Sequence, residues 1–303
     1  MVEIGGGRRL FVRRRGAGTP TVLFEAGIAA SSLNWQFLQD RISQLAGTMS
    51  YDRCGLGWSG PCSTVRTPGN VAMEFHALLD HAGAKPPYVL VGHSFGGLAM
   101  RRFALLYPDE VAAIVLIDPM RCEEWPPLNP GKLADLARGQ RMCRYAVPIA
   151  QVGLARLGLE SLLLRDGLLS GRLARLAGDG TQYVLGRVRG EIEKLPREMR
   201  PEMAALWSRP AFYRGVRSHL AAVPETVMEM ADAEPVRGTP VLVLTPGRST
   251  PLSADALRQI GDNVLQLVVP DSAHWIHLDQ PEIVFNLIRE VVASAQSATM
   301  ATK

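Results

Sequence analysis

The chain has 303 residues, of which 47% are hydrophobic and 20% are charged, and its formal net charge is +4. This composition excludes a disordered chain, a collagen-like repeat and a disulfide scaffold. A chain of this length can bury a large core without disulfides or metals. The small excess of Lys and Arg does not indicate a nucleic-acid partner, and no run reaches the ~18 apolar residues of a membrane span.

The cysteines form no C-x-x-C pair, and no histidine stands at a zinc-ligand spacing from them. They are Cys54, Cys62, Cys122 and Cys143. We expect free thiols in a reducing compartment, with a Cys54–Cys62 bridge left open. The first 20 residues lack the apolar segment of a signal peptide. No phosphate loop, dinucleotide fingerprint or metal cluster is recognisable, so the sequence predicts a cytoplasmic protein with no cofactor.

Apolar strand-like runs alternate with helix-like runs up to residue 120 and again after residue 236. The expected strands are 10–12 (second arm of a hairpin), 21–25, 49–51, 88–91, 111–117, 241–244 and 264–269. The expected helices are 33–45, 71–81, 97–107, 253–260 and 282–293, before a frayed tail at 294–303. Strands separated by helices predict an α/β fold whose sheet is mostly parallel and covered on both faces.

No strand pattern is present between Asp118 and Pro235, where Leu, Ala and Arg predominate. A connection of this length is far beyond the usual loop. We expect an α/β core formed by 1–120 and 236–303, with about eight strands. The segment 121–235 is expected to be a helical cap, or lid, inserted after the sixth strand. An interfacial amphipathic helix is the less favoured alternative.

Residues 92–96 read Gly-His-Ser-Phe-Gly and fit G-x-S-x-G between a strand and a helix. Such a turn presents the Ser94 hydroxyl at the carboxyl edge of the sheet. Gly92 and Gly96 lack Cβ atoms, which lets neighbouring elements pack close to the turn. The Phe95 N–H then lies at a helix N-terminus, where it can donate to a developing negative charge. A glycine turn with an incidental serine is the competing interpretation.

Four motifs in this order carry a family resemblance. They are Phe-Glu-Ala-Gly-Ile at 24–28, Tyr-Asp-Arg-Cys-Gly-Leu-Gly-Trp-Ser at 51–59, Gly-His-Ser-Phe-Gly-Gly at 92–97 and His-Trp-Ile-His-Leu-Asp-Gln-Pro at 274–281. The sequence resembles the α/β-hydrolase fold superfamily, in particular its capped, carboxylesterase-like serine hydrolases, over about residues 10–293. The resemblance implies a catalytic triad with Ser94 as the nucleophile.

The resemblance also assigns the partners of Ser94. It places the base in the loop after the last strand, at His274. The loop at 245–251, where the family usually carries the acid, contains no Asp. Some capped members carry the acid at the end of the strand after the nucleophile helix, which here is Asp118, with Asp255 as the fallback. The backbone N–H groups of Phe95 and Ile28 would form the oxyanion hole.

The other histidines are expected to be structural. They are His76, His81, His93, His219 and His277. Asp52 and Arg53 are expected to form an ion pair that supports nearby loops, while Trp35 could belong to the core or to the pocket.

These features predict a serine hydrolase that cleaves a small-molecule carboxylic ester through an acyl-enzyme intermediate. Apolar residues in the insertion favour an apolar group on that ester; they are Leu162, Leu163, Leu164, Leu168 and Leu169. Amidase, lyase or perhydrolase chemistry by the same triad, and a non-enzymatic ligand binder on the same fold, stay open as alternatives.

Overall fold

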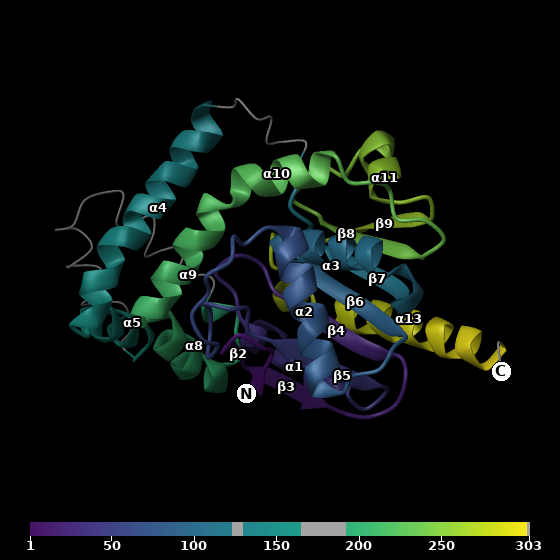
Figure 1. The fold of residues 1–303 in the computed structure, drawn as a ribbon, viewed down its shortest axis with the longest axis horizontal. Coiled ribbons are helices and arrows are strands. Elements are labelled where there is room, and N and C mark those ends of the chain that lie inside the picture. The colour runs from purple at the N-terminus through teal and green to yellow at the C-terminus, as the bar shows by residue number, and fades with distance from the viewer. Residues whose placement is uncertain (123–129, 165–191, 302–303) are drawn as a thin grey trace.

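A computed structural model describes residues 1–122, 130–164 and 192–301, and a seven-stranded sheet forms its centre (Figure 1). The strand order is β3-β5-β4-β6-β7-β8-β9. The strands are β3 (Val12–Arg15), β4 (Thr21–Glu25), β5 (Gly47–Tyr51), β6 (Tyr88–His93), β7 (Val111–Ile117), β8 (Val241–Pro246) and β9 (Val264–Val269). Only the pairing of β3 with β5 is antiparallel; the other pairs are parallel. The expected α/β architecture is therefore confirmed, with seven strands in this sheet where about eight were expected and with the insertion after its fifth strand in chain order, β7, where the sixth was expected.

The expected hairpin is also present, but it is shorter than predicted. β1 (Val2–Glu3) pairs antiparallel with β2 (Arg9–Leu10) in a separate small sheet. Val12 instead begins β3 and lies opposite Tyr51 of β5. The early chain therefore contributes to both sheets.

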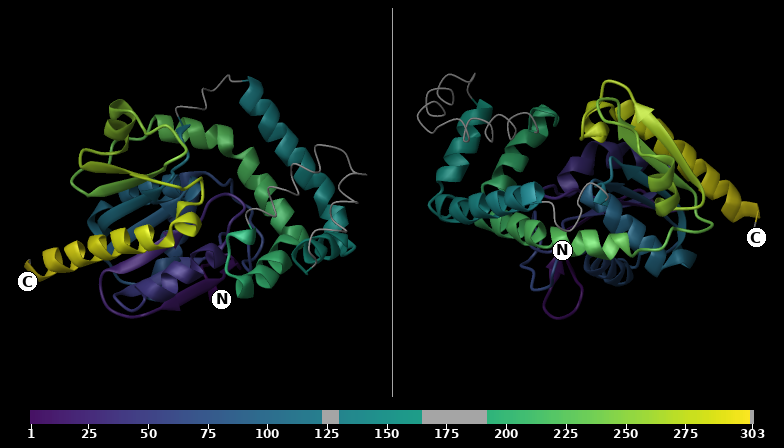
Figure 2. Two further views of the ribbon diagram at one scale, coloured as in Figure 1. Left: turned by 180° about the vertical axis from the view of Figure 1, so that it is seen from behind. Right: turned by 90° about the horizontal axis from the view of Figure 1, so that it is seen from above.

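Helices cover both faces of the sheet. They are α1 (Gln36–Ile42), α2 (Pro68–Ala82), α3 (Phe95–Leu106), α11 (Ala254–Ile260), α12 (Ile276–Asp279) and α13 (Pro281–Ala301), with the 3-10 turn η1 (Ser32–Trp35) before α1. Alternate residues of a strand point to opposite faces. Thus Val22 packs in a core with Ile288 of α13, whereas Leu23 packs in a second core with Phe75 of α2. Figure 2 shows α13 on the face opposite to α2 and α3.

The tail predicted to be frayed is instead helical as far as Ala301. Val284, Ile288, Val292 and Ala295 are buried and recur at spacings of three or four residues. That spacing places them on one face of a helix. The small, polar residues beyond this stripe extend the same helix, which is why composition alone gave the wrong prediction there.

The insertion follows β7 and returns to the sheet at β8. Its described helices are α4 (Pro130–Gln151), α5 (Leu154–Leu164), α8 (Arg200–Trp207), α9 (Pro210–Ala221) and α10 (Val223–Ala231). α4 packs against α9, and α5 packs against α8. In Figure 1 these four helices lie to one side of the sheet, and α10 leads back toward it.

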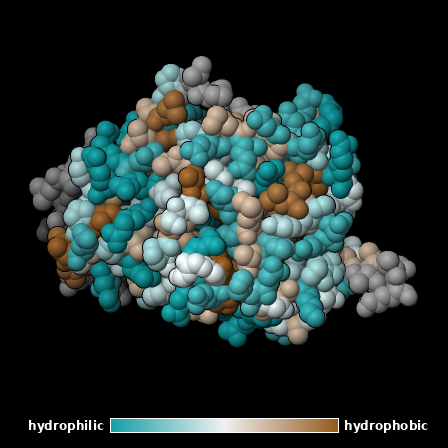
Figure 3. Space-filling view, viewed as in Figure 1, coloured by the Kyte–Doolittle hydropathy of each residue, from teal (hydrophilic) through white to brown (hydrophobic). Residues whose placement is uncertain are grey.

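The surface in Figure 3 is mainly hydrophilic, with apolar patches that are small and scattered. Among the described helices, none combines the length and the apolar character that crossing a membrane requires.

Candidate active site

The turn between β6 and α3 holds Ser94 in an unusual backbone conformation, with φ of 55° and ψ of −121°. A Cβ atom added to Gly92 would lie 2.5 Å from the carbonyl oxygen of Gly96. One added to Gly96 would lie 2.6 Å from the carbonyl oxygen of Ala26. Only glycine fits at these two positions, so the steric requirement that the motif implied is present here. The strain at Ser94 is of a kind that clusters at functional sites.

Asp118 and His274 meet at the carboxyl edge of the sheet. Asp118 follows β7, His274 precedes α12, and the His274 Nδ1 lies 2.6 Å from Asp118 Oδ2. Asp118 is anchored because its N–H donates to the Leu244 carbonyl, at 2.8 Å. With Nδ1 engaged, the His274 Nε2 is the ring nitrogen left to act on a nucleophile.

Ser94, Asp118 and His274 line one pocket of about 400 Å³. The Met120 N–H donates to the Ser94 carbonyl at 3.2 Å, which ties the chain after Asp118 to the nucleophile turn. Within the described part of the chain the Ser94 hydroxyl has no hydrogen-bond partner, so it is open to the pocket. The structure thus brings together the three residues that the sequence singled out.

Asp255 lies elsewhere. It stands in the first turn of α11, pairs with Arg258, and its side chain is 82% exposed. It does not line the pocket that contains Ser94. The geometry therefore favours Asp118 over Asp255 as the partner of His274.

Two backbone N–H groups are available beside Ser94. The Phe95 N–H opens α3, and the Ile28 N–H follows Gly27 in the loop after β4. Gly27 is close to the nucleophile, because a Cβ built there would lie 3.3 Å from the Ser94 Cβ. Among the residues that the structure describes, neither N–H has a hydrogen-bond acceptor. The arrangement can therefore stabilise an oxyanion formed on a substrate at Ser94.

Arg53 orients the loop that carries Ile28. Its guanidinium donates to the Ala26 carbonyl at 2.9 Å and also to the Gly27 carbonyl. The C=O and N–H of one trans peptide point in opposite directions. Holding the Gly27 carbonyl toward Arg53 therefore aims the Ile28 N–H away from Arg53.

The expected Asp52–Arg53 ion pair is wrong. Arg53 pairs with Glu25, with 3.4 Å between Nη1 and Oε1. Asp52 instead accepts from the backbone N–H groups of Ser32 and Trp58, each at 2.8 Å. Asp52 and Arg53 follow β5 directly and reach different partners.

Glu25 is a buried carboxyl group beneath the oxyanion loop. It accepts from the Ala26 N–H at 3.0 Å and from the Tyr51 hydroxyl. Burial raises the pKa of Glu25 to about 7, against the opposing effect of the Arg53 charge. β4 and β5 are parallel neighbours that pair Phe24 with Ser50, which places Glu25 beside Tyr51. The sequence analysis did not identify this cluster.

His93, His277 and Trp35 are buried side chains whose contacts are those of core residues. His93 Nε2 donates to the His274 carbonyl at 2.8 Å, and burial keeps the pKa of His93 well below its usual value. His277 stacks on Trp35 at 4.4 Å, and burial lowers the pKa of His277 to about 3. Trp35 is fully buried in the core and does not line the pocket.

The three remaining histidines do not line this pocket, although the His219 ring packs edge-on against Phe95 with 5.6 Å between ring centroids. His76 lies 3.0 Å from a Glu110 oxygen, and His81 Nδ1 lies 2.8 Å from the Ala77 carbonyl oxygen. His219 is buried on α9 with Nδ1 3.0 Å from the Gly215 carbonyl oxygen.

The pocket has further lining residues that sequence reasoning missed: Pro119, Met120, Arg121, Ser249 and Thr250. Their only sequence signal is adjacency to Asp118 and to the loop at 245–251. The Arg121 guanidinium donates to the Thr250 carbonyl at 2.5 Å, which joins the two loops across the pocket. The leucines that suggested an apolar substrate group lie outside the residues whose side chains the structure describes.

Comparisons with known proteins agree with this geometry. A family profile described as "alpha/beta hydrolase fold" matches residues 20–154. The uncharacterized protein YqjL of Bacillus subtilis is 37% identical over 106 residues, which are 35% of this chain and 42% of that protein. The chain thus spans less than half the length of the first curated relatives that it matches.

Two longer similarities cover most of the chain. The 2-(acetamidomethylene)succinate hydrolase of Mesorhizobium japonicum is 26% identical over 93% of this chain and 91% of its own length. A thermophilic esterase from Thermogutta terrifontis, solved with malate bound, has a TM-score of 0.62 and 22% identity over 95% of this chain and 94% of its own. Together with the family profile, these similarities show that the chain has the α/β-hydrolase fold.

Proposed function

We propose that this protein is a serine hydrolase that cleaves small-molecule carboxylic esters through an acyl-enzyme intermediate. The observation that carries the proposal is the 2.6 Å contact between His274 and Asp118 in the pocket onto which the Ser94 hydroxyl opens. A serine hydroxyl is a weak nucleophile until a base takes its proton. An imidazole held by a carboxylate in such a pocket is the base that this chemistry needs.

In the proposed reaction, the Ser94 oxygen attacks the ester carbonyl while His274 Nε2 accepts its proton. The N–H groups of Phe95 and Ile28 stabilise the oxyanion of the tetrahedral intermediate. His274 then gives the proton to the departing alcohol, and Asp118 stabilises the charged imidazole throughout. Water, activated by His274, finally releases the acid from Ser94.

The Ser94 hydroxyl makes no hydrogen bond to His274 in the structure, where His274 Nδ1 contacts Asp118. Catalytic hydrogen bonds are often long without substrate and tighten in the Michaelis complex. This arrangement is therefore compatible with the proposed reaction.

We further propose that 121–235 acts as a cap on the core formed by 1–120 and 236–303, and that it sets substrate shape. A second pocket of about 290 Å³ shares Pro119, Met120 and Arg121 with the first. Its apolar lining includes Leu98, Leu116, Met230, Leu252 and Ile260. Met230 belongs to α10 of the insertion. The adjoining apolar space supports an ester with an apolar group.

The test is hydrolysis of p-nitrophenyl esters of increasing acyl length by the wild type and by Ser94→Ala. We expect turnover in the wild type and a loss of about 10⁴-fold or more in the variant. Equal rates in both proteins, or no turnover with any ester, would reject the proposal. A non-enzymatic ligand binder would give the second result.

Amide hydrolysis is the second candidate, and Arg121 favours it for an anionic substrate. Arg121 is a lining residue of the Ser94 pocket, and Arg pairs well with carboxylates. The Mesorhizobium relative is named for an amide-containing succinate. The two candidates are separated by comparing N-acyl and O-acyl substrates with and without a carboxylate. Only amide hydrolysis of an anionic substrate predicts that Arg121→Met raises KM selectively for the carboxylate-bearing amides.

A further inference from the structure

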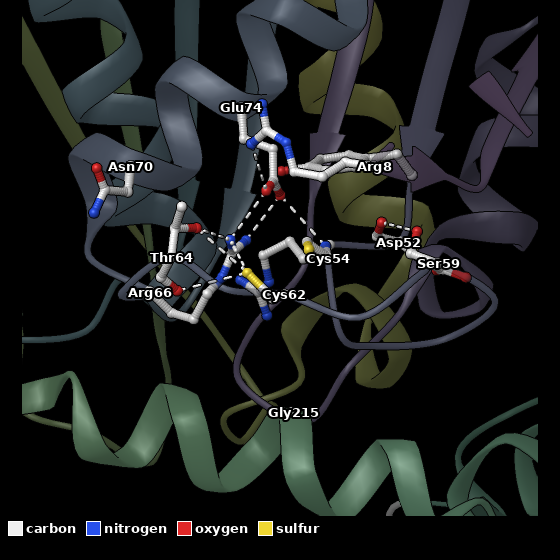
Figure 4. Close-up of polar contacts among 12 residues, drawn as sticks. Arg8, Asp52, Cys54, Ser59, Cys62, Thr64, Arg66, Asn70, Glu74 and Gly215 are labelled. Carbon is white, nitrogen blue, oxygen red and sulfur yellow. Dashed lines mark hydrogen bonds and ion pairs between the residues drawn. The ribbon is translucent and has the colours of Figure 1, made fainter. Parts of the chain in front are cut away.

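A second group of reactive side chains lies outside the proposed active site, around the loop that follows β5. Cys54 and Cys62 flank this loop, and the Gly55 N–H donates to the Gly60 carbonyl at 2.7 Å, which draws its two ends together. The two Sγ atoms and a carboxylate oxygen of Glu74 all lie within 4.8 Å of one another. Figure 4 shows Cys62, Arg66 and Glu74 directed toward one another.

Arg66 is the centre of this group. It is fully buried, and its Nη1 donates to Cys62 Sγ at 3.0 Å and to Glu74 Oε2 at 3.0 Å. Its Nη2 donates to Glu74 Oε1 at 2.8 Å. A second guanidinium, from Arg8, lies 3.9 Å from Glu74.

The charges of this group favour ionisation of Cys62. Two guanidinium groups against one carboxylate leave an excess of one positive charge, which a Cys62 thiolate would balance. The neighbouring Cys54 thiol and, after it, Arg66 lower the pKa of Cys62 to about 5, although burial opposes them.

Cys54 has the opposite environment. It is buried, its Sγ donates to the Pro61 carbonyl at 3.0 Å, and the contact with Cys62 and burial raise its pKa. Cys62 is partly exposed. An external reagent therefore reaches Cys62 first, and the protonated Cys54 thiol lies beside it.

We propose that Cys62 is an oxidant-sensitive thiolate and that Cys54 is its resolving partner, so that a hydroperoxide converts the pair into a disulfide. The Cys62 sulfur attacks the terminal oxygen of ROOH, the O–O bond breaks, and ROH leaves after protonation. Sulfur loses two electrons, the peroxide gains them, and Cys62 becomes a sulfenic acid. The Cys54 sulfur then displaces the sulfenic hydroxyl, which leaves as water with the Cys54 proton, and an S–S bond forms.

A metal site fits these residues less well. Both Glu74 oxygens already accept from Arg66, and the Cys54 N–H donates to Oε1 at 3.3 Å. Two neighbouring guanidinium charges repel a divalent cation. Thiol chemistry is therefore the better use of this group.

The disulfide would close the loop on which the insertion rests. The Gly55 backbone packs on Gly215 of α9, at 3.7 Å from the ideal Gly55 Cβ position to the Gly215 Cα. Arg209 also donates to the Gly57 carbonyl at 2.6 Å. Figure 4 shows α9 passing beside this loop. This inference does not depend on the proposed ester hydrolysis.

The first test measures iodoacetamide labelling of each cysteine in the folded, reduced protein by peptide mass spectrometry. Cys143 is the matched control, because it is also partly exposed and burial raises its pKa. At pH 6 a larger fraction of Cys62 than of Cys143 is thiolate, although a thiolate of lower pKa is intrinsically less nucleophilic. The net expectation is that Cys62 is alkylated about fivefold or more faster than Cys143. The Cys62 rate should level off above pH ~6, whereas the Cys143 rate should still rise about tenfold per pH unit. Equal rates or parallel pH profiles would overturn the proposal.

Arg8→Gln removes one of the two positive charges at a partly exposed position, where the fold should tolerate the change. We expect the Cys62 profile to shift to higher pH in this variant while the Cys143 profile stays in place. An unchanged Cys62 profile would remove the electrostatic basis of the proposal.

The second test adds one equivalent of hydrogen peroxide. The wild type and Cys143→Ser should form the Cys54–Cys62 disulfide, Cys54→Ser should stop at a dimedone-trapped Cys62 sulfenic acid, and Cys62→Ser should form neither. The proposal would be overturned if both thiols of the wild type stayed reduced, or if Cys62 were over-oxidised with no disulfide formed to Cys54. Stoichiometric binding of Zn²⁺ alone to the reduced wild type that is lost in Cys62→Ser would also overturn it.

Discussion

Asp118→Asn is the substitution that tests the proposed triad most directly. It preserves the size and shape of the side chain that lies 2.6 Å from His274 Nδ1, but it removes the negative charge. The amide of Asn can also donate to Nδ1. The imidazole would then carry its proton on Nε2, the nitrogen that must accept the proton of Ser94.

The expected loss follows from both effects. An imidazolium that forms next to a neutral amide loses its charge partner, and the tautomer is wrong for proton abstraction. Losses of about 10³- to 10⁴-fold in kcat are expected, which correspond to about 4–5.5 kcal/mol of transition-state stabilisation. KM should change little, because the side chain is not proposed to bind substrate.

The assay is steady-state hydrolysis of p-nitrophenyl butyrate, with thermal unfolding as a check on folding. Asp255→Asn is the matched control, since its carboxylate is exposed and outside the pocket. It should keep kcat within about twofold of the wild type. A folded Asp118→Asn variant that retains a tenth of the wild-type kcat, or a large loss in Asp255→Asn, would refute the assignment.

Three further predictions concern folding and pH. Ser94→Gly should be more stable than Ser94→Ala by up to about 1–2 kcal/mol, and so unfold at a higher temperature in calorimetry, because glycine accepts the positive φ of 55° without strain. Equal stabilities would show that the turn is not strained. Gly96→Ala should destabilise the protein by about 2–3 kcal/mol in urea unfolding, because the new Cβ would overlap the carbonyl oxygens of Glu25 and Ala26. The control Gly158→Ala has open space around the new Cβ and should be neutral or stabilising. The pKa of Glu25 is raised to about 7 in the folded state, so its contribution to stability is complete below pH ~4.5 and is lost as the pH rises through 7. Between pH 5 and 8 the unfolding free energy of the wild type should therefore fall relative to that of Glu25→Gln, by up to about 3 kcal/mol. A difference that stays constant with pH would contradict the raised pKa.

Local signals in the sequence were enough for the α/β fold and for the serine turn. Continuous apolar strands and intervening helices follow from spacing, and Gly92 and Gly96 around Ser94 follow from steric need. The empty acid loop at 245–251 pointed to Asp118, and the structure places Asp118 beside His274. The strands and the serine turn follow from chain order and steric geometry, whereas the choice of Asp118 and His274 also needed the family resemblance.

The partners of buried charges could not be predicted in the same way. Glu25 and Arg53 are 28 positions apart and come together because β4 and β5 are parallel neighbours whose carboxyl ends align. Sequence adjacency suggested Asp52 as the partner of Arg53, but Asp52 accepts from the backbone N–H groups of Ser32 and Trp58 while Arg53 pairs with Glu25. The register between strands is a tertiary property that no short motif specifies.

The oxyanion loop is held from two sides by different kinds of contact. Gly96 at the start of α3 leaves space only for the backbone of Glu25 and Ala26, while Arg53 binds the carbonyl groups of Ala26 and Gly27. Steric contact on one side and charge-assisted hydrogen bonds on the other fix the peptide that carries the Ile28 N–H. Arg53 is itself held by the buried Glu25. The buried guanidinium of Arg53 therefore positions the Ile28 N–H at the pocket. In this arrangement, preorganisation of the oxyanion hole depends on the pairing of β4 with β5 as much as on the serine motif.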